Sequence, residues 1–130
     1  MANEVKILNQ VNYLNGTLID NYQPSQLSLP QTTKGIQIST VTATTVGAAV
    51  ALTGVPTPSW VWLQSLEATT TGKNVRVSIV ASSTVTPSYG MMLKAKHVHQ
   101  TTLASSGATI TLQAETAAST IQVLVRAYNA

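Results

Sequence analysis

The chain has 130 residues, which is enough for one domain that buries its own core without disulfide bonds or metal ions. Charged residues make up 8% of the chain, against about 25% in ordinary globular proteins, and the net charge is +3. The basic residues are scattered, which argues against a nucleic-acid footprint, and the lack of cysteine excludes disulfides, thiolate nucleophiles and cysteine-ligated zinc. With 20 Thr, 12 Ser, 9 Gln and 7 Asn, uncharged polar side chains must cover most of the surface.

The N-terminus opens no apolar stretch of signal-peptide length, and the longest run of small apolar residues, 46–52, is too short to span a bilayer. We therefore expect a protein without a membrane segment that is made and folded in a reducing cytoplasm. Asn15-Gly16-Thr17 matches a glycosylation sequon, which we interpret as a turn because no secretion signal precedes it.

Residues 1–35 differ from the rest of the chain, because they hold five of the seven Asn, two of the five Pro, and apolar residues that follow no long period. We expect an extended N-terminal arm with one short strand or helical turn, too apolar to be a free linker. The arm should pack either on its own domain or on a neighbouring subunit. The apolar residues expected to bind a partner there are Tyr13, Leu14, Leu18, Tyr22, Leu27 and Leu29.

From Ile36 onward the pattern is β throughout, so we expect residues 36–130 to form one domain. Trp60–Leu66 is apolar on both faces, which predicts a central strand covered on both sides. Other short runs alternate between apolar and polar residues and are separated by turn signals every 8–15 residues. About six to eight strands of this kind favour an all-β fold, an antiparallel β-sandwich of jelly-roll type, over any βαβ arrangement.

His97 and His99 form the one spacing that suits a metal site, because two residues apart on a strand both imidazoles point the same way. A catalytic zinc site usually needs three protein ligands, and the chain has no third His. Three copies around a three-fold axis could still complete a ligand set. The interpretation we favour is a solvated or hydrogen-bonded pair, with no metal and no cofactor.

The aromatic residues of the β-region allow two interpretations. Trp60 and Trp62, with Tyr89, could form a platform on which a sugar stacks, as in a carbohydrate-binding module. The segment around the two Trp residues is apolar on both sides, however, which favours their burial in the core. Met91 and Met92 could likewise form a pliable contact surface, although core filling after a turn is the interpretation we favour.

Catalysis is not expected from this sequence. A Ser or Thr nucleophile needs an adjacent base and an orienting partner, and the chain has two His, one Asp and no G-x-S-x-G motif. No phosphate-binding loop or dinucleotide fingerprint occurs either. A carboxylate pair would have to come from four dispersed acids, Glu4, Asp20, Glu67 and Glu115.

Two stretches resemble a known family. Residues 15–33 follow the pattern N-G-x-L-x-D-x-[YF]-x-P-x-x-L-S, and a second stretch runs from T-P-S-W-V-W-L-Q-S-L-E-A at 57–68 to L-Q-A-E-T-A-A-S-T-I-Q-V-L-V at 112–125. Together they resemble small virion structural proteins of tailed bacteriophages, of the head-decoration, head-fibre or minor structural type. The pattern covers most of the chain, which departs from it at an insertion-like strand, Lys73–Ser83, and at His97–His99, where a turn with Gly is usual.

The resemblance implies a capsid decoration or cement protein that binds the outer shell through its arm and a sheet edge, and it carries over no catalytic residue. Its partners would be the major capsid protein or other virion proteins, and its place the virion, after synthesis in the host bacterial cytoplasm. A homo-oligomer, with a trimer favoured, would suit the three-fold positions of a shell. The alternatives are a tail, neck or fibre component of the virion, and the carbohydrate-binding module.

Overall fold

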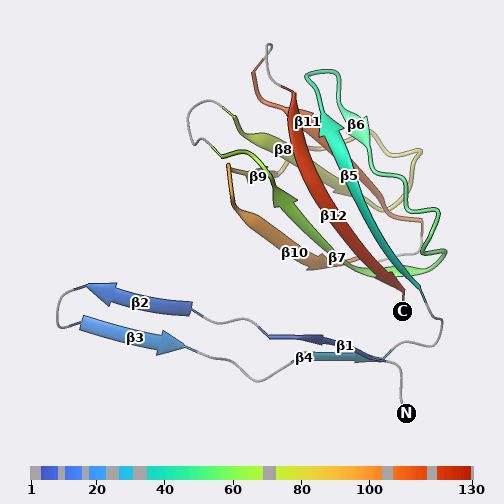
Figure 1. The fold of residues 1–130 in the computed structure, drawn as a ribbon. Helices are drawn as coiled ribbons and strands as arrows, with labels where there is room; N and C mark the ends of the chain where they lie inside the picture. Colours follow the sequence, from blue (N-terminus) through green and yellow to red (C-terminus); the bar gives the residue numbers. More distant parts are fainter. Residues whose placement is uncertain are drawn as a thin grey trace. The chain divides into compact units, whose positions relative to one another are not determined.

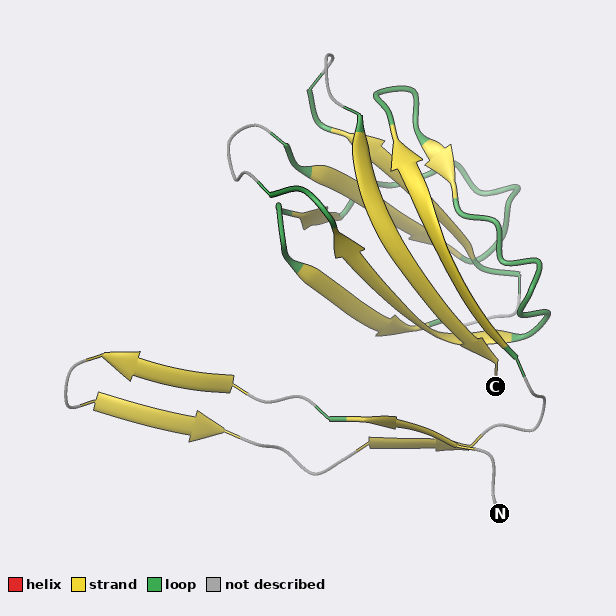
Figure 2. Ribbon diagram, viewed as in Figure 1, coloured by secondary structure: helices red, strands yellow, loops and turns green. Residues whose placement is uncertain are grey.

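The computed structural model describes residues 4–8, 11–15, 18–22, 27–30, 35–68, 73–103, 107–116 and 120–129. In this part of the chain every regular element is a β-strand (Figure 1, Figure 2). The described residues accordingly include no helix with the length and apolar character needed to cross a membrane. The chain divides into two compact units, Met1–Lys34 and Gly35–Ala130, which we call unit 1 and unit 2.

Unit 1 contains two short antiparallel ladders. Here the sequence predicted one short strand or helical turn, and the structure has four strands. Strands of four or five residues are too short to show a period, and β1 pairs with a strand that is distant in the sequence. β2 and β3 are separated by only two residues, but Asn15-Gly16 was interpreted as a turn and not as the signal of a hairpin. The ladders join β1 (Glu4–Ile7) with β4 (Leu27–Pro30), and β2 (Val11–Asn15) with β3 (Leu18–Tyr22).

Unit 2 is built of two four-stranded antiparallel sheets, which confirms the expected all-β class. Sheet I has the strand order β10–β7–β12–β5, and sheet II has the order β6–β11–β8–β9. The eight strands are β5 (Ile36–Ala43), β6 (Ala48–Ala49), β7 (Pro58–Ser65), β8 (Val75–Val80), β9 (Met91–Leu93), β10 (Val98–Thr102), β11 (Thr109–Ala114) and β12 (Ile121–Asn129).

The strands of unit 2 pair in a nested order. β5 pairs with β12, β6 with β11, β7 with β10, and β8 with β9, so the first strand meets the last and the two middle strands meet each other. Two further ladders, β12 with β7 and β11 with β8, complete the two sheets. The second half of unit 2 therefore returns along the first half, as in one long hairpin that has been folded over.

The two sheets face each other across one hydrophobic core. In β12 the alternation is regular, since Ile121, Val123, Val125 and Ala127 are fully buried and the residues between them are not. Burial of each such Val, Leu or Ile side chain contributes about 1.5–3 kcal/mol. The other strands add a second set of buried side chains, which includes Val61, Leu63, Val75, Val77, Leu93, Ile110 and Leu112.

The strand expected within residues 73–83 is present as β8. It lies inside sheet II, between β11 and β9. Its register with β11 is continuous from Thr109–Val80 to Ala114–Val75. Val75 and Val77 are buried in the core, so this segment is an integral part of the fold.

The two ends of unit 2 are joined around a buried amide side chain. Asn129 is fully buried, its backbone N–H donates to Gly35 O at 3.2 Å, and its Oδ1 accepts the Thr57 N–H at 3.2 Å. A Cβ atom at Gly35 would overlap Asn129 Nδ2 and lie 2.9 Å from Asn129 Cγ. Position 35 therefore requires glycine because of the close approach of this side chain.

We predict that Gly35→Ala destabilises the protein by about 1–3 kcal/mol, because Asn129 must move and its hydrogen bond to Thr57 must weaken. Chemical denaturation with circular dichroism detection measures this change. Gly90→Ala is the matched control, since a Cβ at Gly90 meets no atom within 4 Å. Equal stability of the two variants would contradict the close packing at residue 35.

A tight turn precedes β10. Lys94 O accepts the His97 N–H at 3.0 Å, and Lys96 has a φ of 63°, a left-handed conformation that usually favours Gly. The left-handed conformation therefore falls on Lys96, whose side chain makes it less favourable than it would be for Gly.

We predict that Lys96→Gly stabilises the protein by about 0.5–1 kcal/mol, because removal of Cβ relieves the left-handed strain at a small entropic cost. Lys96→Val should have the opposite effect, since a β-branched residue tolerates positive φ poorly. Thermal unfolding of the two variants beside the wild type measures both shifts. A loss of stability in Lys96→Gly would refute this account of the turn.

Candidate functional site

The outer face of sheet I, which is turned away from the core, carries a continuous aromatic cluster. On β7, Val61 and Leu63 belong to the core, so Trp60 and Trp62 occupy the opposite face. The register places Tyr128 of β12 beside Trp60. The same face of sheet I is completed by side chains from the two edge strands and from β12, at Ile36, Ile38, Gln100, Thr102 and Arg126.

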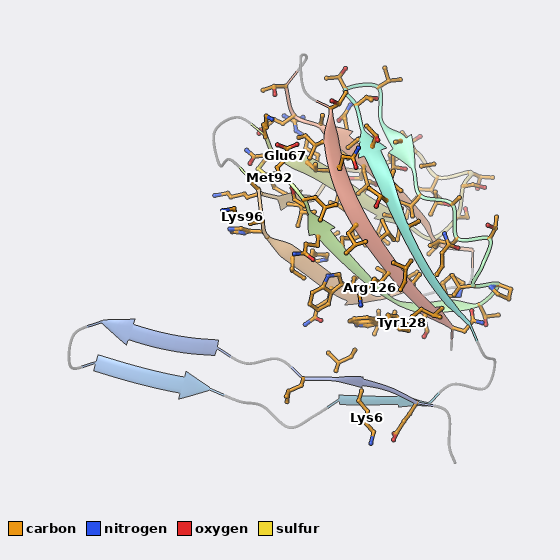
Figure 3. All side chains as sticks on the ribbon, in the orientation of Figure 1. Lys6, Glu67, Met92, Lys96, Arg126 and Tyr128 are labelled. Atoms are coloured by element: carbon orange, nitrogen blue, oxygen red, sulfur yellow. The ribbon has the colours of Figure 1, made fainter. Side chains whose placement is uncertain are left out.

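The three rings of this face contact one another in tilted pairs. The ring centroids of Trp60 and Tyr128 are 5.1 Å apart at 48°, and those of Trp60 and Trp62 are 6.2 Å apart at 56° (Tyr128 is labelled in Figure 3). Such pairs contribute about 0.5–1.5 kcal/mol each beyond the burial of area. Trp60 lies in the middle and is only 6% exposed, so its ring presents almost no face on which a sugar could stack.

The structure corrects the expectation that both Trp residues belong to the core. Trp60 is buried, but on the outer side of sheet I, and Trp62 is half-buried on the same side. The third ring is Tyr128 and not Tyr89, whose Oη lies 3.1 Å from the position of a Cβ on Gly47. Sequence reasoning did not assign Tyr128 to the aromatic cluster. The signal that could have done so is its alternation with Val125 and Ala127 of β12, which are buried on the opposite face.

One polar atom in this cluster has no partner within the described residues. The indole Nε1 of Trp62 is buried and makes no hydrogen bond there. A buried donor without an acceptor costs about 1–3 kcal/mol. Trp62 is therefore held on this face by the contacts of its ring and not by its N–H group.

The outer face of sheet II is covered by the chain itself at one position, Ser78. Ser78 lies on that face of β8, opposite to the core residue Val77, yet it is fully buried. The N–H of Ser88 donates to Ser78 Oγ at 2.8 Å, which brings the connection between β8 and β9 over the strand. Of the two Met residues that open β9, Met91 packs against the core and Met92 is 48% exposed.

The two His residues occupy different environments. His97 is exposed at the end of the turn before β10, and only His99 lies in the strand, where it is half-buried. His99 Nε2 is buried and has no hydrogen-bond partner within the described residues. In that part of the chain no group of three or more His, Cys, Asp or Glu side chains comes close enough to hold a metal ion.

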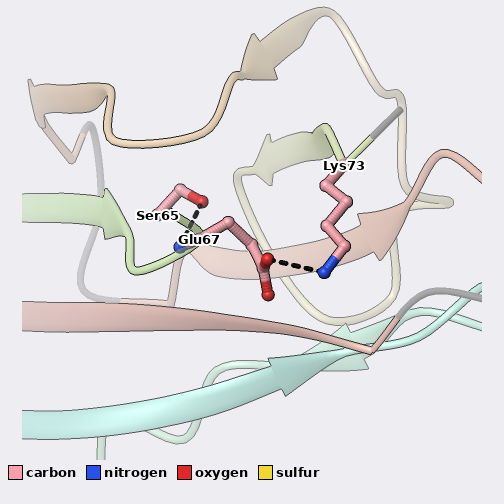
Figure 4. A network of polar contacts seen from close by, with 3 residues as sticks. All are labelled: Ser65, Glu67 and Lys73. Carbon is pink, nitrogen blue, oxygen red and sulfur yellow. Dashed lines mark hydrogen bonds and ion pairs between the residues drawn. The ribbon is translucent and has the colours of Figure 1, made fainter. Parts of the chain in front are cut away.

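Two of the four acids are neutralised where β7, β8 and β11 meet. Lys73 Nζ lies 2.9 Å from Glu67 Oε2, and the Glu67 N–H donates to Ser65 Oγ at 3.4 Å (Figure 4). Glu115 accepts a hydrogen bond from Asn74 Nδ2 at 2.7 Å and lies 3.9 Å from Arg76. Because the Lys73 side chain is 42% exposed, its ion pair contributes less than about 1 kcal/mol.

The partner-binding residues expected in the N-terminal region all lie on strands of unit 1, where the structure describes the backbone and not these side chains. Leu27 and Leu29 pair with Ile7 and Val5, so the β1–β4 ladder has four aliphatic positions on one face. Glu4, Lys6, Ser28 and Pro30 take the other face. In the β2–β3 ladder, Tyr13, Leu18 and Tyr22 share one face by register, and Leu14 lies on the other.

We predict that the two Trp residues differ in fluorescence because they differ in burial. Trp62→Phe, which leaves Trp60, should emit at short wavelength and resist quenching by acrylamide, whereas Trp60→Phe should leave a more red-shifted and more quenchable ring. Host polysaccharide should shift neither spectrum. A polysaccharide-dependent shift in the Trp62→Phe variant would revive the carbohydrate-binding interpretation.

Comparisons with known proteins leave this surface without an assigned role. The sequence matches no family model, no curated protein and no solved structure. What the chain binds must therefore be inferred from its own residues.

Proposed function

We propose that the chain is a structural protein of a tailed-phage virion, a decoration or cement protein that binds the outside of the capsid and reinforces it. The observation that carries this proposal is the β1–β4 ladder, in which Val5, Ile7, Leu27 and Leu29 share one face. Of these four side chains the structure describes that of Ile7, which is buried, and a two-stranded ladder is marginally stable alone. It is suited to packing on a second apolar surface, for which we propose the capsid.

The nested pairing of unit 2 supports the proposal by analogy of fold. We infer that its eight strands form a jelly roll, because in that fold a long hairpin is wound so that outer strands pair with outer and inner with inner. Jelly rolls recur in viral capsid proteins and also in lectins. Since one fold serves many functions, the strand order favours the virion proposal without carrying it alone.

The low surface charge also favours a repetitive assembly. Identical copies that lie side by side repel one another through every unpaired charge of the same sign. Here Glu67 and Lys73 neutralise each other, as do Glu4 and Lys6, whose side chains are 3.0 Å apart. Many copies can therefore be bound close together in the virion, which the phage assembles inside the host bacterium.

We predict that the double variant Leu27→Asp/Leu29→Asp loses attachment to capsids, because two carboxylates on the aliphatic face cannot be buried without a large desolvation cost. Co-sedimentation of the purified protein with undecorated capsids measures attachment. Ser28→Asp is the matched control, because it puts the same charge on the opposite face of the same strand. Undiminished attachment of the double variant would refute the proposed role of unit 1.

A position in the tail, neck or a fibre is the second candidate, because the aliphatic face of the β1–β4 ladder could also pack on a virion protein there. Copy number separates the two positions. Hundreds of copies per virion indicate the shell, whereas about 3–12 indicate a closed ring at the neck or tail. Quantitative mass spectrometry of purified virions gives this number.

A further inference from the structure

The two sheets of unit 2 have four edge strands, and they differ in how well they are protected against pairing with another chain. Natural edges are kept short, charged, bulged or interrupted by proline. β6 has two residues and β9 has three, with Lys94 directly after it. β10 contains His99 and follows Lys96 and His97. Three of the four edges therefore have a recognisable protection.

The fourth edge, β5, has none of these protections. It is eight residues long, and its sequence Ile-Gln-Ile-Ser-Thr-Val-Thr-Ala contains no charge, no proline and no glycine. Its register with β12 is unbroken over all eight residues, so it has no bulge. Within the described residues, its ladder partner is β12 alone, so β5 is an edge strand of sheet I (Figure 1).

Two features of β5 indicate that this edge strand lacks a packing partner and a hydrogen-bond partner. Ile36 and Ile38 are 55% and 56% exposed on its outer face. On the inner face, Gln37 is satisfied by Gly54 N–H and Ala51 O, but Ser39 Oγ is buried and has no hydrogen-bond partner within the described residues. The middle of the strand thus combines an unsatisfied hydroxyl with exposed aliphatic side chains.

We propose that β5 pairs antiparallel with β5 of a second copy of this chain, about a two-fold axis at Ser39, so that the two copies of sheet I form one continuous sheet. In an antiparallel ladder, directly paired residues lie on the same face. Centring the axis on Ser39 pairs Ile38 with Thr40, and Gln37 with Val41, of the other copy. Outer faces then meet outer faces, and inner faces meet inner faces.

This register gives the Ser39 hydroxyl a hydrogen-bond partner and gives Ile38 an apolar neighbour. The two Ser39 side chains lie directly opposite each other across the axis. Rotation of each buried hydroxyl about χ1 toward the edge lets one donate a hydrogen bond to the other. The two Ile38 side chains become diagonal neighbours on the outer face, within reach of each other, and shield each other from water. The strand is self-complementary, which is the requirement for an isologous interface.

The contact goes beyond the proposed function and does not rest on it, because it forms in solution without a capsid. It also differs from the trimer that the sequence favoured, since a two-fold pairing of one edge closes after two subunits. If the chain does not attach to capsids, the β5–β5 contact is not contradicted. If the β5–β5 contact is not found, the proposed role of unit 1 is not contradicted.

Cysteine cross-linking tests the register, because the chain has no cysteine of its own. In full-length Ser39→Cys, oxidation by diamide, which accepts the two electrons and two protons of the thiol pair, should convert most of the protein to a covalent dimer. Val41→Cys is the control on the same face of β5, and its two thiols would be about 13 Å apart in this register. Equal cross-linking of the two variants would overturn the proposal.

Native mass tests the interface itself. By light scattering after size exclusion, the full-length chain should have twice its mass of 13.7 kDa. Ile38→Lys, at an exposed position that a monomer tolerates, should halve the measured mass, whereas Thr102→Lys on the opposite edge of sheet I should leave it unchanged. A monomeric or trimeric wild type, or a dimeric Ile38→Lys variant, would overturn the proposal.

Discussion

The two backbone ladders of β12 are the interaction on which the rest of unit 2 depends. This strand bonds to β5 on one side and to β7 on the other, and thereby joins the beginning, the middle and the end of the unit. Its inward residues are fully buried, and its outward residues include Tyr128, which packs against Trp60. A change in its register by one residue would exchange core and surface along the whole strand.

The faces and edges of the two sheets serve different purposes. On the outer face of sheet II, the β8–β9 connection covers Ser78, whereas Arg76 and Met92 on the same face are exposed. On sheet I an aromatic cluster stiffens the centre, while the exposed aliphatic side chains lie at the β5 edge. The surfaces that we propose for association therefore lie at a sheet edge and in the N-terminal ladders.

Alternation in the sequence was sufficient to predict the all-β class and a central strand at β7. It could not decide which side of β7 meets the core, because Trp60 and Trp62 have the same period as Val61 and Leu63. We assigned the large Trp rings to the core, but the smaller aliphatic residues of β7 fill the space between the two sheets. In unit 1, β1 and β4 were missed because each depends on a partner that is distant in the sequence, whereas the β2–β3 pairing could have been inferred from Asn15-Gly16 between the two strands.

The hydrogen bond between Gly35 and Asn129 brings the first and last strands of unit 2 to one point. A short peptide between these residues could therefore close unit 2 into a ring, and the chain could be reopened in a surface connection between two other strands. Chain ends that lie side by side favour such circular permutation. For the same reason, a cargo peptide fused after Asn129 would emerge beside Gly35.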